Sequence, residues 1–287
     1  MTPHTIIDCG WGRLLMGQTF ATQRELVDAL VAEAPKQRDV ALYAQDPHVL
    51  VALAPQQLFL DPSHTYRLDL SLARDWFHAQ SGPGWQVREA TIDDEAAIQR
   101  ILQARHMVPV WDGFMRQALS QPALRILVAE ETDTHRVVGV VTGVDHVAAC
   151  QEPERGSSLW SLAVDPQCVR QGIGLGLTRS LASSFAHDGL HHMDLSVMHD
   201  NTQAIELYDK LGFERVPIFC VKNRNPINEL LYVGADSDEG LNIYAKLIVK
   251  EARRRGIHAE VLDAEYDYFR LSLGGRSITC RESLSDL

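Results

Sequence analysis

The chain lacks the features that mark membrane, secreted and nucleic-acid-binding proteins. No apolar run approaches the roughly 20 residues of a membrane-spanning helix, and the N-terminus has no basic segment followed by an apolar core. The five cysteines are scattered and form no C-x-x-C pair, which indicates reduced thiols. With 27 Lys and Arg against 38 Asp and Glu, the net charge of -11 disfavours nucleic acid and anionic membranes as partners. We therefore expect a cytoplasmic protein that acts on a small molecule without a bound metal; a homo-oligomer remains open.

The length and composition are those of a globular protein with more than one core. The chain has 287 residues, of which 45% are hydrophobic and 23% charged, enough for two or three domains. Turn-rich segments at 81–84 and 223–228 are candidate linkers. We expect a small α/β N-terminal domain at 1–84, a central domain at 85–228 and a C-terminal α/β segment at 229–287.

Hydrophobic periodicity predicts alternating helices and strands. In the N-terminal part we expect a helix at 25–34 and strands at 40–43 and 49–53. The central part is predicted to contain strands at 85–91, 124–130, 137–144, 158–164 and 215–222, with helices from 93, at 111–119 and at 177–186. The C-terminal part is expected to open as β-α-β, with a strand at 230–234, a helix at 241–255, a strand at 259–262 and a hairpin at 269–280.

A glycine-rich turn is the segment that most directly indicates chemistry. Gly172, Gly174 and Gly176 stand between the apolar strand 162–164 and the helical run 177–186. Without β-carbons, this backbone can lay its N–H groups against a pyrophosphate, and the dipole of the following helix adds attraction.

A second helix follows the next strand. Asn201, Ala204, Tyr208 and Leu211 are separated by 3, 4 and 3 residues, which places them on one helical face. For Ala204 and Leu211 a packing role explains the pattern. Tyr208 differs, because a buried phenol needs a hydrogen-bond partner.

The order of strand, glycine turn, helix, strand and helix from Leu162 to Phe213 resembles the GNAT superfamily of acetyl-CoA-dependent N-acetyltransferases. The resemblance implies an α/β (α+β) fold with a mixed, central splayed sheet flanked by helices. It also implies acetyl-CoA as cosubstrate, no metal, and direct attack of an amine on the thioester. A covalent acyl-cysteine is less favoured, because no cysteine is paired in sequence with a convincing base.

The resemblance also assigns roles to individual residues. Those implied to contact acetyl-CoA are Leu162, Ala163, Val164, Arg170, Gln171, Gly172, Ile173, Gly174, Leu175 and Asn201. Tyr208 corresponds to the tyrosine that protonates the departing thiolate, and a backbone amide near Ala163 or Val164 would stabilise the oxyanion. One position departs from the family, which usually has Gln or Arg where this chain has Val169. A shifted register beginning at Gln171 restores the pattern and leaves the contacting amides open.

The general base is not fixed by the sequence. A free α-amino group with a pKa of about 7.7 to 8.0 must lose a proton before it attacks. Many relatives carry a glutamate on the strand before the turn, where this chain has Leu, Trp and Ser at 159–161. Asp194 or His199 is the predicted base, and Asp145, His146 and a chain of water molecules are alternatives.

Further segments resemble a narrower group, the bacterial N-acetylglutaminylglutamine synthetases. They are residues 12–20, 58–67, 194–201, 274–277 and 280–284. These enzymes join a GNAT module to an ATP-grasp ligase and help to make the osmoprotectant N-acetylglutaminylglutamine amide. The resemblance implies that glutamine or a glutamine dipeptide is the acceptor, and that 229–287 is the opening segment of the ATP-grasp part.

Several alternatives remain at this stage. The expected nucleotide-binding lysines and metal-binding carboxylates of a ligase are missing from 229–287, so ATP-driven ligation is not predicted. The acceptor could be another small amine or a protein N-terminus, since a fold does not fix the substrate. A non-catalytic acetyl-CoA-sensing module is a third hypothesis. The Asp-Pro turns at 46–47 and 61–62 are ordinary turn chemistry, which leaves His48 and His64 as minor candidates.

Overall fold

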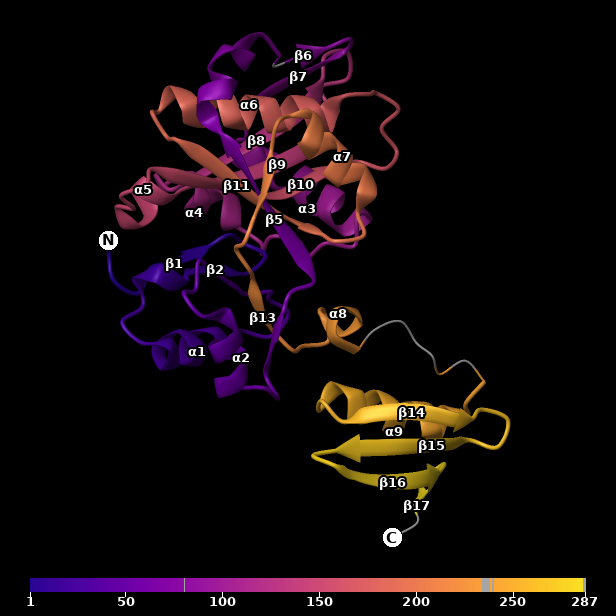
Figure 1. Ribbon diagram of the computed structural model, residues 1–287. Helices are drawn as coiled ribbons and strands as arrows, with labels where there is room; N and C mark the ends of the chain where they lie inside the picture. Colours follow the sequence, from indigo (N-terminus) through magenta and orange to yellow (C-terminus); the bar gives the residue numbers. More distant parts are fainter. Residues whose placement is uncertain (80, 234–237, 239, 286–287) are drawn as a thin grey trace.

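The computed structural model describes residues 1–79, 81–233, 238 and 240–285, and within this part the strands form three sheets (Figure 1). An eight-stranded central sheet lies beside a five-stranded N-terminal sheet. A four-stranded sheet follows near the C-terminus.

The central sheet is mixed. Its order is β12 (Glu214–Val216), β5 (Ser63–Asp69), β11 (His192–Met198), β10 (Gly156–Val164), β9 (Val137–Asp145), β8 (Leu124–Glu131), β7 (Trp85–Glu89) and β6 (Ser81–Gly82). Strands β10 and β11 run parallel, and the other described pairs are antiparallel.

Both faces of this sheet are covered, as the alternation along β8 shows. Ile126 and Val128 belong to one core, whereas Leu127 and Ala129 belong to the other, because successive side chains of a strand point to opposite faces. Helices α6 (Ile173–His187) and α7 (Thr202–Lys210) and the 3₁₀ helix at Leu70–Ala79 cover the second face. Helices α3 (Glu95–Ala104) and α4 (Phe114–Ala118), together with the N-terminal sheet, cover the first.

The central sheet splits between β10 and β11. The two strands pair only over Gly156–Leu159 and His192–Leu195. Beyond that point β10 stays on β9 and β11 stays on β5, so the strands separate. A bulge at Ser161, whose φ is 51°, accompanies the split. The predicted splayed, mixed sheet is therefore confirmed.

The N-terminal sheet combines four strands from the start of the chain with one strand, β13 (Val221–Asn223), from beyond the central sheet. Its order is β1 (Ile6–Asp8), β2 (Arg13–Met16), β3 (Val40–Leu42), β13 and β4 (Leu58–Leu60), and helices α1 (Gln23–Val31) and α2 (Pro47–Leu53) pack on one face. The chain passes from β4 into β5 of the central sheet and returns from β12 into β13. The expected domain boundaries at 84 and 228 stay predictions. The two sheets exchange strands across residue 84, because β5 precedes it but belongs to the central sheet, and β13 follows it but belongs to the N-terminal sheet.

Two expected strands are wrong. Residues 49–53 lie in α2, because Pro47 occupies its first position, where a missing N–H costs nothing, and Leu50 packs into the helix-covered core. The strand predicted at 215–222 is two strands, β12 and β13, in different sheets.

Two further expectations also need correction. The linker predicted at 81–84 is a hairpin, since β6 pairs with β7. The strand predicted at 230–234 is helix α8 (Glu229–Val233), preceded by a turn in which the Asn225 side chain accepts from the Asn228 amide; Gly234 lies outside the described residues.

The C-terminal part therefore does not open as β-α-β. Helix α9 (Ile243–Arg254) packs on an antiparallel sheet in the order β14 (His258–Asp263), β15 (Tyr268–Leu273), β16 (Arg276–Arg281) and β17 (Leu284–Ser285). The helix and the hairpin are where the sequence predicts them. The remaining short helices are α5 (His146–Cys150) and 3₁₀ turns at Gly17–Thr19 and Ile92–Asp94.

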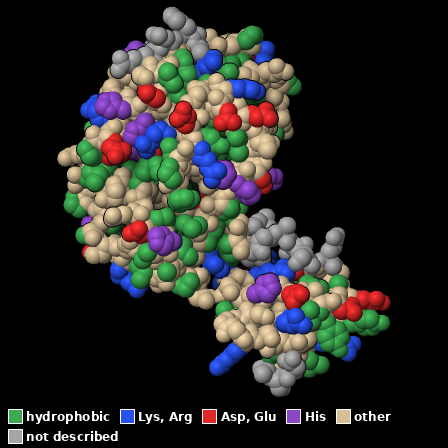
Figure 2. Space-filling view, viewed as in Figure 1, with side chains coloured by type: hydrophobic (Ala, Val, Ile, Leu, Met, Phe, Trp, Pro, Cys, Tyr) green, Lys and Arg blue, Asp and Glu red, His purple; other side chains and the backbone are tan. Residues whose placement is uncertain are grey.

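The surface shows no strong segregation of charge in the view of Figure 2. Acidic and basic side chains are interspersed over the described part of that face. Across the described residues, every helix is too short or too polar to cross a bilayer.

Candidate active site

The glycine turn begins helix α6. Gly172 is the N-cap residue with φ of 81°, a backbone angle that glycine adopts without strain. The first helical hydrogen bond runs from the Gly176 amide to the Gly172 carbonyl at 2.8 Å. The N–H groups of Ile173, Gly174 and Leu175 therefore have no acceptor within the helix. They form a set of donors at the positive end of a 15-residue helix.

The three glycines serve different purposes. A β-carbon on Gly176 would lie 2.3 Å from the Trp85 ring, so this glycine is needed for packing. A β-carbon on Gly174 would meet only Val164 Cγ2, at 3.9 Å. The turn therefore lies against the end of β10, and its Gly174 face is otherwise open.

Side chains around the turn hold it in place. The Trp85 indole donates to the Gln171 carbonyl at 3.2 Å. The Arg170 guanidinium is paired with Asp133 at 2.9 Å and lies 3.7 Å from Glu131. Because the guanidinium of Arg170 is paired, a contribution of this residue to pyrophosphate binding would come from its main chain. Val169 is 89% exposed beside it.

The strand residues predicted to contact the cofactor line the split. Leu162 and Val164 pack toward α6, and Ala163 faces the opposite core. The Arg105 guanidinium donates to the Val164 carbonyl at 2.6 Å, which fixes the end of β10.

Helix α7 carries the two remaining candidates. Asn201 is its N-cap, and its side-chain oxygen accepts from the Ala204 amide at 3.2 Å. Tyr208 is buried against Phe213, with ring centroids 5.5 Å apart. Burial raises the pKa of Tyr208 to about 12, so the phenol keeps its proton at neutral pH. No described residue hydrogen-bonds its hydroxyl in this structure.

Asp194 is fully engaged by its neighbours. Its carboxylate accepts two hydrogen bonds from Arg67, at 2.7 and 2.9 Å, and one from the Tyr43 hydroxyl at 2.7 Å. The carboxylate of Asp194 is buried, and the pKa of Tyr43 is raised by burial and by the charge of Asp194. This arrangement joins β5 and β11 to Tyr43, the residue after β3, and leaves little room for proton transfer.

We expect Asp194→Asn to lower the free energy of unfolding by about 1–3 kcal/mol, because Arg67 would lose its charged partner. The turnover number of the folded protein should change little. Urea unfolding and initial rates would measure the two effects. Glu206→Gln is a control, since Glu206 is in an exposed pair 3.9 Å from Lys210 and such pairs contribute about 0–1 kcal/mol. A large loss of turnover with unchanged stability would instead identify Asp194 as the base.

Asp145 and His146 both make contacts that hold the fold together. Asp145 caps α5 by accepting from the Ala148 amide at 2.9 Å. His146 is completely buried, with Nε2 lying 2.9 Å from the Ser158 hydroxyl. Desolvation lowers the pKa of His146 to about 3, so its ring is neutral at physiological pH.

This histidine predicts a pH dependence of stability. Its folded-state pKa of about 3 lies below the unfolded value of about 6.5. The contribution of His146 to the free energy of unfolding is therefore constant above about pH 6.5. It falls as the pH drops from about 6.5 toward 3, because only the imidazole of the unfolded chain binds a proton. The slope due to His146 should approach about 1.4 kcal/mol per pH unit. Urea unfolding between pH 7 and 5 should show a smaller slope for His146→Gln than for the unmodified chain; equal slopes would contradict this.

His199 is exposed at the end of β11. Its Nδ1 lies 3.0 Å from the Pro62 carbonyl. Because a carbonyl only accepts, Nδ1 carries the proton in this contact and Nε2 is left with its lone pair. His64 lies beside it, with ring centroids 6.4 Å apart. In the neutral form of the ring, the contact with Pro62 leaves Nε2 as the nitrogen that could accept a proton.

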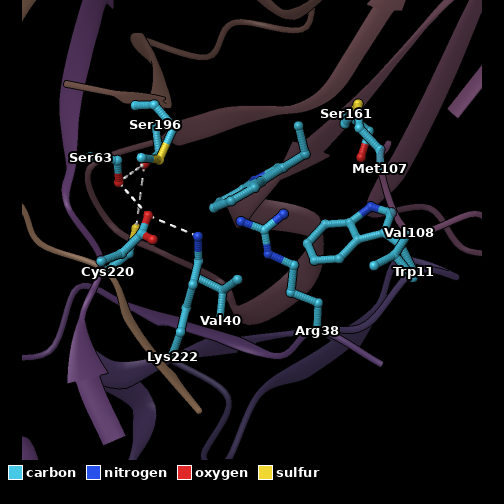
Figure 3. Close-up of a pocket in the computed structure, with 13 residues that line it drawn as sticks. Trp11, Arg38, Val40, Ser63, Met107, Val108, Ser161, Ser196, Cys220 and Lys222 are labelled. Carbon is cyan, nitrogen blue, oxygen red and sulfur yellow. Dashed lines mark hydrogen bonds and ion pairs between the residues drawn. The ribbon is translucent and has the colours of Figure 1, made fainter. Parts of the chain in front are cut away.

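A charged pocket opens where β10 and β11 separate (Figure 3). It has a volume of about 160 Å³, and its lining comes from both sheets. The lining residues are Trp11, Arg38, Val40, Asp61, Ser63, Met107, Val108, Trp160, Ser161, Ser196, Met198, Cys220 and Lys222. Trp160 and Ser196 come directly after the last paired residues of the two strands, and Ser161 and Met198 lie a little further along them. The pocket therefore lies at the split.

A polar network forms one wall of the pocket. Lys222 Nζ lies 2.8 Å from Asp61 Oδ2, which also accepts from the Ser63 hydroxyl at 2.5 Å. The Ser63 and Ser196 hydroxyls are 2.7 Å apart. Desolvation lowers the pKa of Lys222, and the nearby charge of Arg38 adds to the effect.

Sequence reasoning missed most of this pocket. Arg38, Asp61 and Lys222 come from three distant segments, and no spacing links them. The one signal was the Asp-Pro-Ser run at 61–63, interpreted there as ordinary turn chemistry. That interpretation overlooked Asp61, whose side chain is buried in the structure.

A separate group of possible metal ligands lies elsewhere. Glu152, Glu154 and His192 have ligand atoms within 4.8 Å of one another, with Glu154 exposed. None of them lines the pocket. The expectation of no metal stays a prediction.

The chain is similar in sequence to known acetyltransferases. The acetyltransferase (GNAT) family model matches residues 74–213. The [ribosomal protein bS18]-alanine N-acetyltransferase of Haemophilus ducreyi is 30% identical over 118 residues, 41% of this chain and 74% of that protein. The mycothiol acetyltransferase of Kocuria rhizophila is 33% identical over 99 residues, 34% of this chain and 32% of that protein.

The solved structures that resemble the chain do so at low identity. A GCN5-related N-acetyltransferase from Sphaerobacter thermophilus has a TM-score of 0.46 and 18% identity, with 65% of this chain and 59% of that chain covered. The chain matches only about a third of the mycothiol acetyltransferase but about three quarters of the Haemophilus enzyme. Because the Haemophilus enzyme is 30% identical and is matched over 74% of its length, and because the family model contains the glycine turn, the split strands and α7, the chain belongs to the GNAT family of acetyltransferases.

Proposed function

We propose that this chain transfers the acetyl group of acetyl-CoA to the α-amino group of glutamine or of a glutamine dipeptide, as in the synthesis of N-acetylglutaminylglutamine amide. The observation that carries the proposal is the position of the α6 donors. They lie against the end of β10, at the split where the charged pocket opens. The resemblance to N-acetylglutaminylglutamine synthetases supports glutamine as the acceptor.

Acetyl-CoA would be held mainly by the main chain. The amides of Ile173, Gly174 and Leu175 bind the pyrophosphate, and the exposed edge of β10 at 162–164 binds the pantetheine arm. Consecutive amides of a strand point to opposite edges, so one of Ala163 and Val164 directs its N–H into the split. That N–H stabilises the developing oxyanion.

Two side chains would move protons. The amine loses a proton as it attacks the thioester carbon, and the thiolate released takes one from Tyr208. Of the two predicted bases, the geometry favours His199, since both oxygens of Asp194 are occupied and Nε2 of His199 is the unprotonated nitrogen in its contact with Pro62. Water can relay the proton between His199 and the amine.

Acceptor profiling tests the proposal. The chain is incubated with acetyl-CoA and a panel containing glutamine, glutaminylglutamine, other amino acids, polyamines and alanine-starting peptides, and CoA release is followed. We expect the two glutamine compounds to react fastest. Inert glutamine compounds beside another reactive amine would overturn the choice of acceptor.

A second candidate is acetylation of a protein N-terminus. The match to the bS18-alanine N-acetyltransferases favours it. In the same panel, faster reaction of alanine-starting peptides would support it. Tight acetyl-CoA binding without acetylation of any amine would instead indicate an acetyl-CoA-sensing module.

A further inference from the structure

The pocket at the split carries an excess of positive charge. Its lining includes two cationic side chains, Arg38 and Lys222, and a single carboxylate, Asp61. Lys222 and Asp61 are paired, and both side chains are buried, with 8% and 2% exposed. Asp61 therefore neutralises Lys222, and the charge of Arg38 is left without a counter-ion among the lining residues.

Three buried polar atoms of the lining residues have no hydrogen-bond partner among the described residues: Trp11 Nε1, Arg38 Nε and Asp61 Oδ1. The Arg38 Nε is shielded from solvent and has no acceptor among the described residues. The Oδ1 of Asp61 is equally shielded and receives no hydrogen bond from them. Buried polar groups are nearly always paired, and each orphan costs about 1–3 kcal/mol or more when charged. A ligand with both an anionic acceptor and a donor would satisfy the atoms of Arg38 and Asp61.

The two cationic side chains of the pocket are placed to meet such a ligand. In Figure 3 the guanidinium of Arg38 and the amine of Lys222 both extend into the pocket. The remaining wall is largely apolar, formed by Met107, Val108 and the Trp11 and Trp160 rings, whose centroids are 5.9 Å apart.

We infer that Arg38 binds a carboxylate of the acceptor and that Asp61 Oδ1 accepts a hydrogen bond from the same molecule. The pocket thus selects a free amino acid or short peptide over a protein N-terminus, whose carboxylate is remote. This inference rests on the proposed acetyl transfer for the identity of the ligand. Arg38 lies just before β3 of the N-terminal sheet. The N-terminal sheet therefore supplies acceptor specificity to the GNAT fold.

Product binding tests the inference without turnover. Calorimetry with CoA-loaded protein compares N-acetylglutamine with N-acetylglutaminamide, which differ only in the carboxylate. The unmodified chain should bind the carboxylate form about 10- to 100-fold more tightly, as expected for a charge-assisted hydrogen bond. Arg38→Gln should remove this preference, and Arg38→Lys should restore part of it.

The controls separate this inference from folding and from the proposed function. Arg24→Gln removes the same charge from an exposed position on α1 and should keep the preference. Unchanged acetyl-CoA affinity in Arg38→Gln would show that the variant is folded. Equal binding of both products to the unmodified chain, or an undiminished preference in Arg38→Gln, would overturn the inference. A preserved carboxylate preference with inert glutamine in the acceptor panel would defeat only the proposed acceptor.

Discussion

Tyr208→Phe is expected to lower kcat about 10²- to 10⁴-fold, the usual contribution of a positioned acid, with little change in acetyl-CoA affinity. The phenol keeps its proton because burial raises its pKa to about 12. It has no protein partner in the described residues that would compete for that proton. The substitution leaves the ring packing on Phe213 intact. Initial rates and calorimetry with acetyl-CoA would measure the two effects.

The matched control for this experiment is Tyr66→Phe. Tyr66 is buried in the same core as Tyr208, with 8% against 6% exposed. Loss of a buried hydroxyl there should leave kcat nearly unchanged. A fully active Tyr208→Phe enzyme would rule out the acid role, and equal losses in both variants would point to a general effect of core hydroxyls.

Gly174→Leu is expected to weaken acetyl-CoA binding at least about 100-fold. The new side chain would cover the amides at the start of α6, and two lost hydrogen bonds to a charged group are worth about 3–6 kcal/mol. The fold should be retained, because a β-carbon at this position meets only Val164 Cγ2 at 3.9 Å. Leucine also favours helix over glycine by nearly 1 kcal/mol. Calorimetry and thermal unfolding would show lost binding with an unchanged or higher Tm.

Gly176→Ala provides the contrast. Its β-carbon would fall 2.3 Å from the Trp85 ring, and overpacking of this kind costs about 1–3 kcal/mol. We therefore expect a lower Tm for Gly176→Ala, even though the added group is small. Normal acetyl-CoA affinity in a folded Gly174→Leu protein would show that the pyrophosphate does not bind at this turn.

The central sheet was predictable because its signals are local. Along β8 and β9 the apolar residues identify strands, and the glycines at 172–176 mark the start of α6. The errors arose where local preference gave way to tertiary context. Val49 and Val51 favour a strand, yet Pro47 begins a helix there. The segment 215–222 is apolar enough for one strand, but it crosses between two sheets.

The candidate site also has one part that the sequence singles out and another part that it does not. The sequence singles out the turn and Tyr208 as candidates, because their residues are close together in the chain and their spacing carries meaning. Arg38 and Lys222 are 184 positions apart by their residue numbers, and only the N-terminal sheet brings them to one pocket. A pairing of that kind leaves no pattern in a single sequence. Among the polar groups of the pocket, Asp61, Ser63, Ser161 and Ser196 belong to segments that the sequence singled out, whereas Arg38 and Lys222 do not.

The exchange of strands between the two sheets has a consequence for unfolding. Strand β5 completes the central sheet only while β4 is held in the N-terminal sheet, and β13 completes the N-terminal sheet only while β12 is held in the central one. Melting either sheet would pull a strand out of the other. Calorimetry should therefore record residues 1–223 as one cooperative transition, and proteolysis at the crossings should release neither half as an intact fragment.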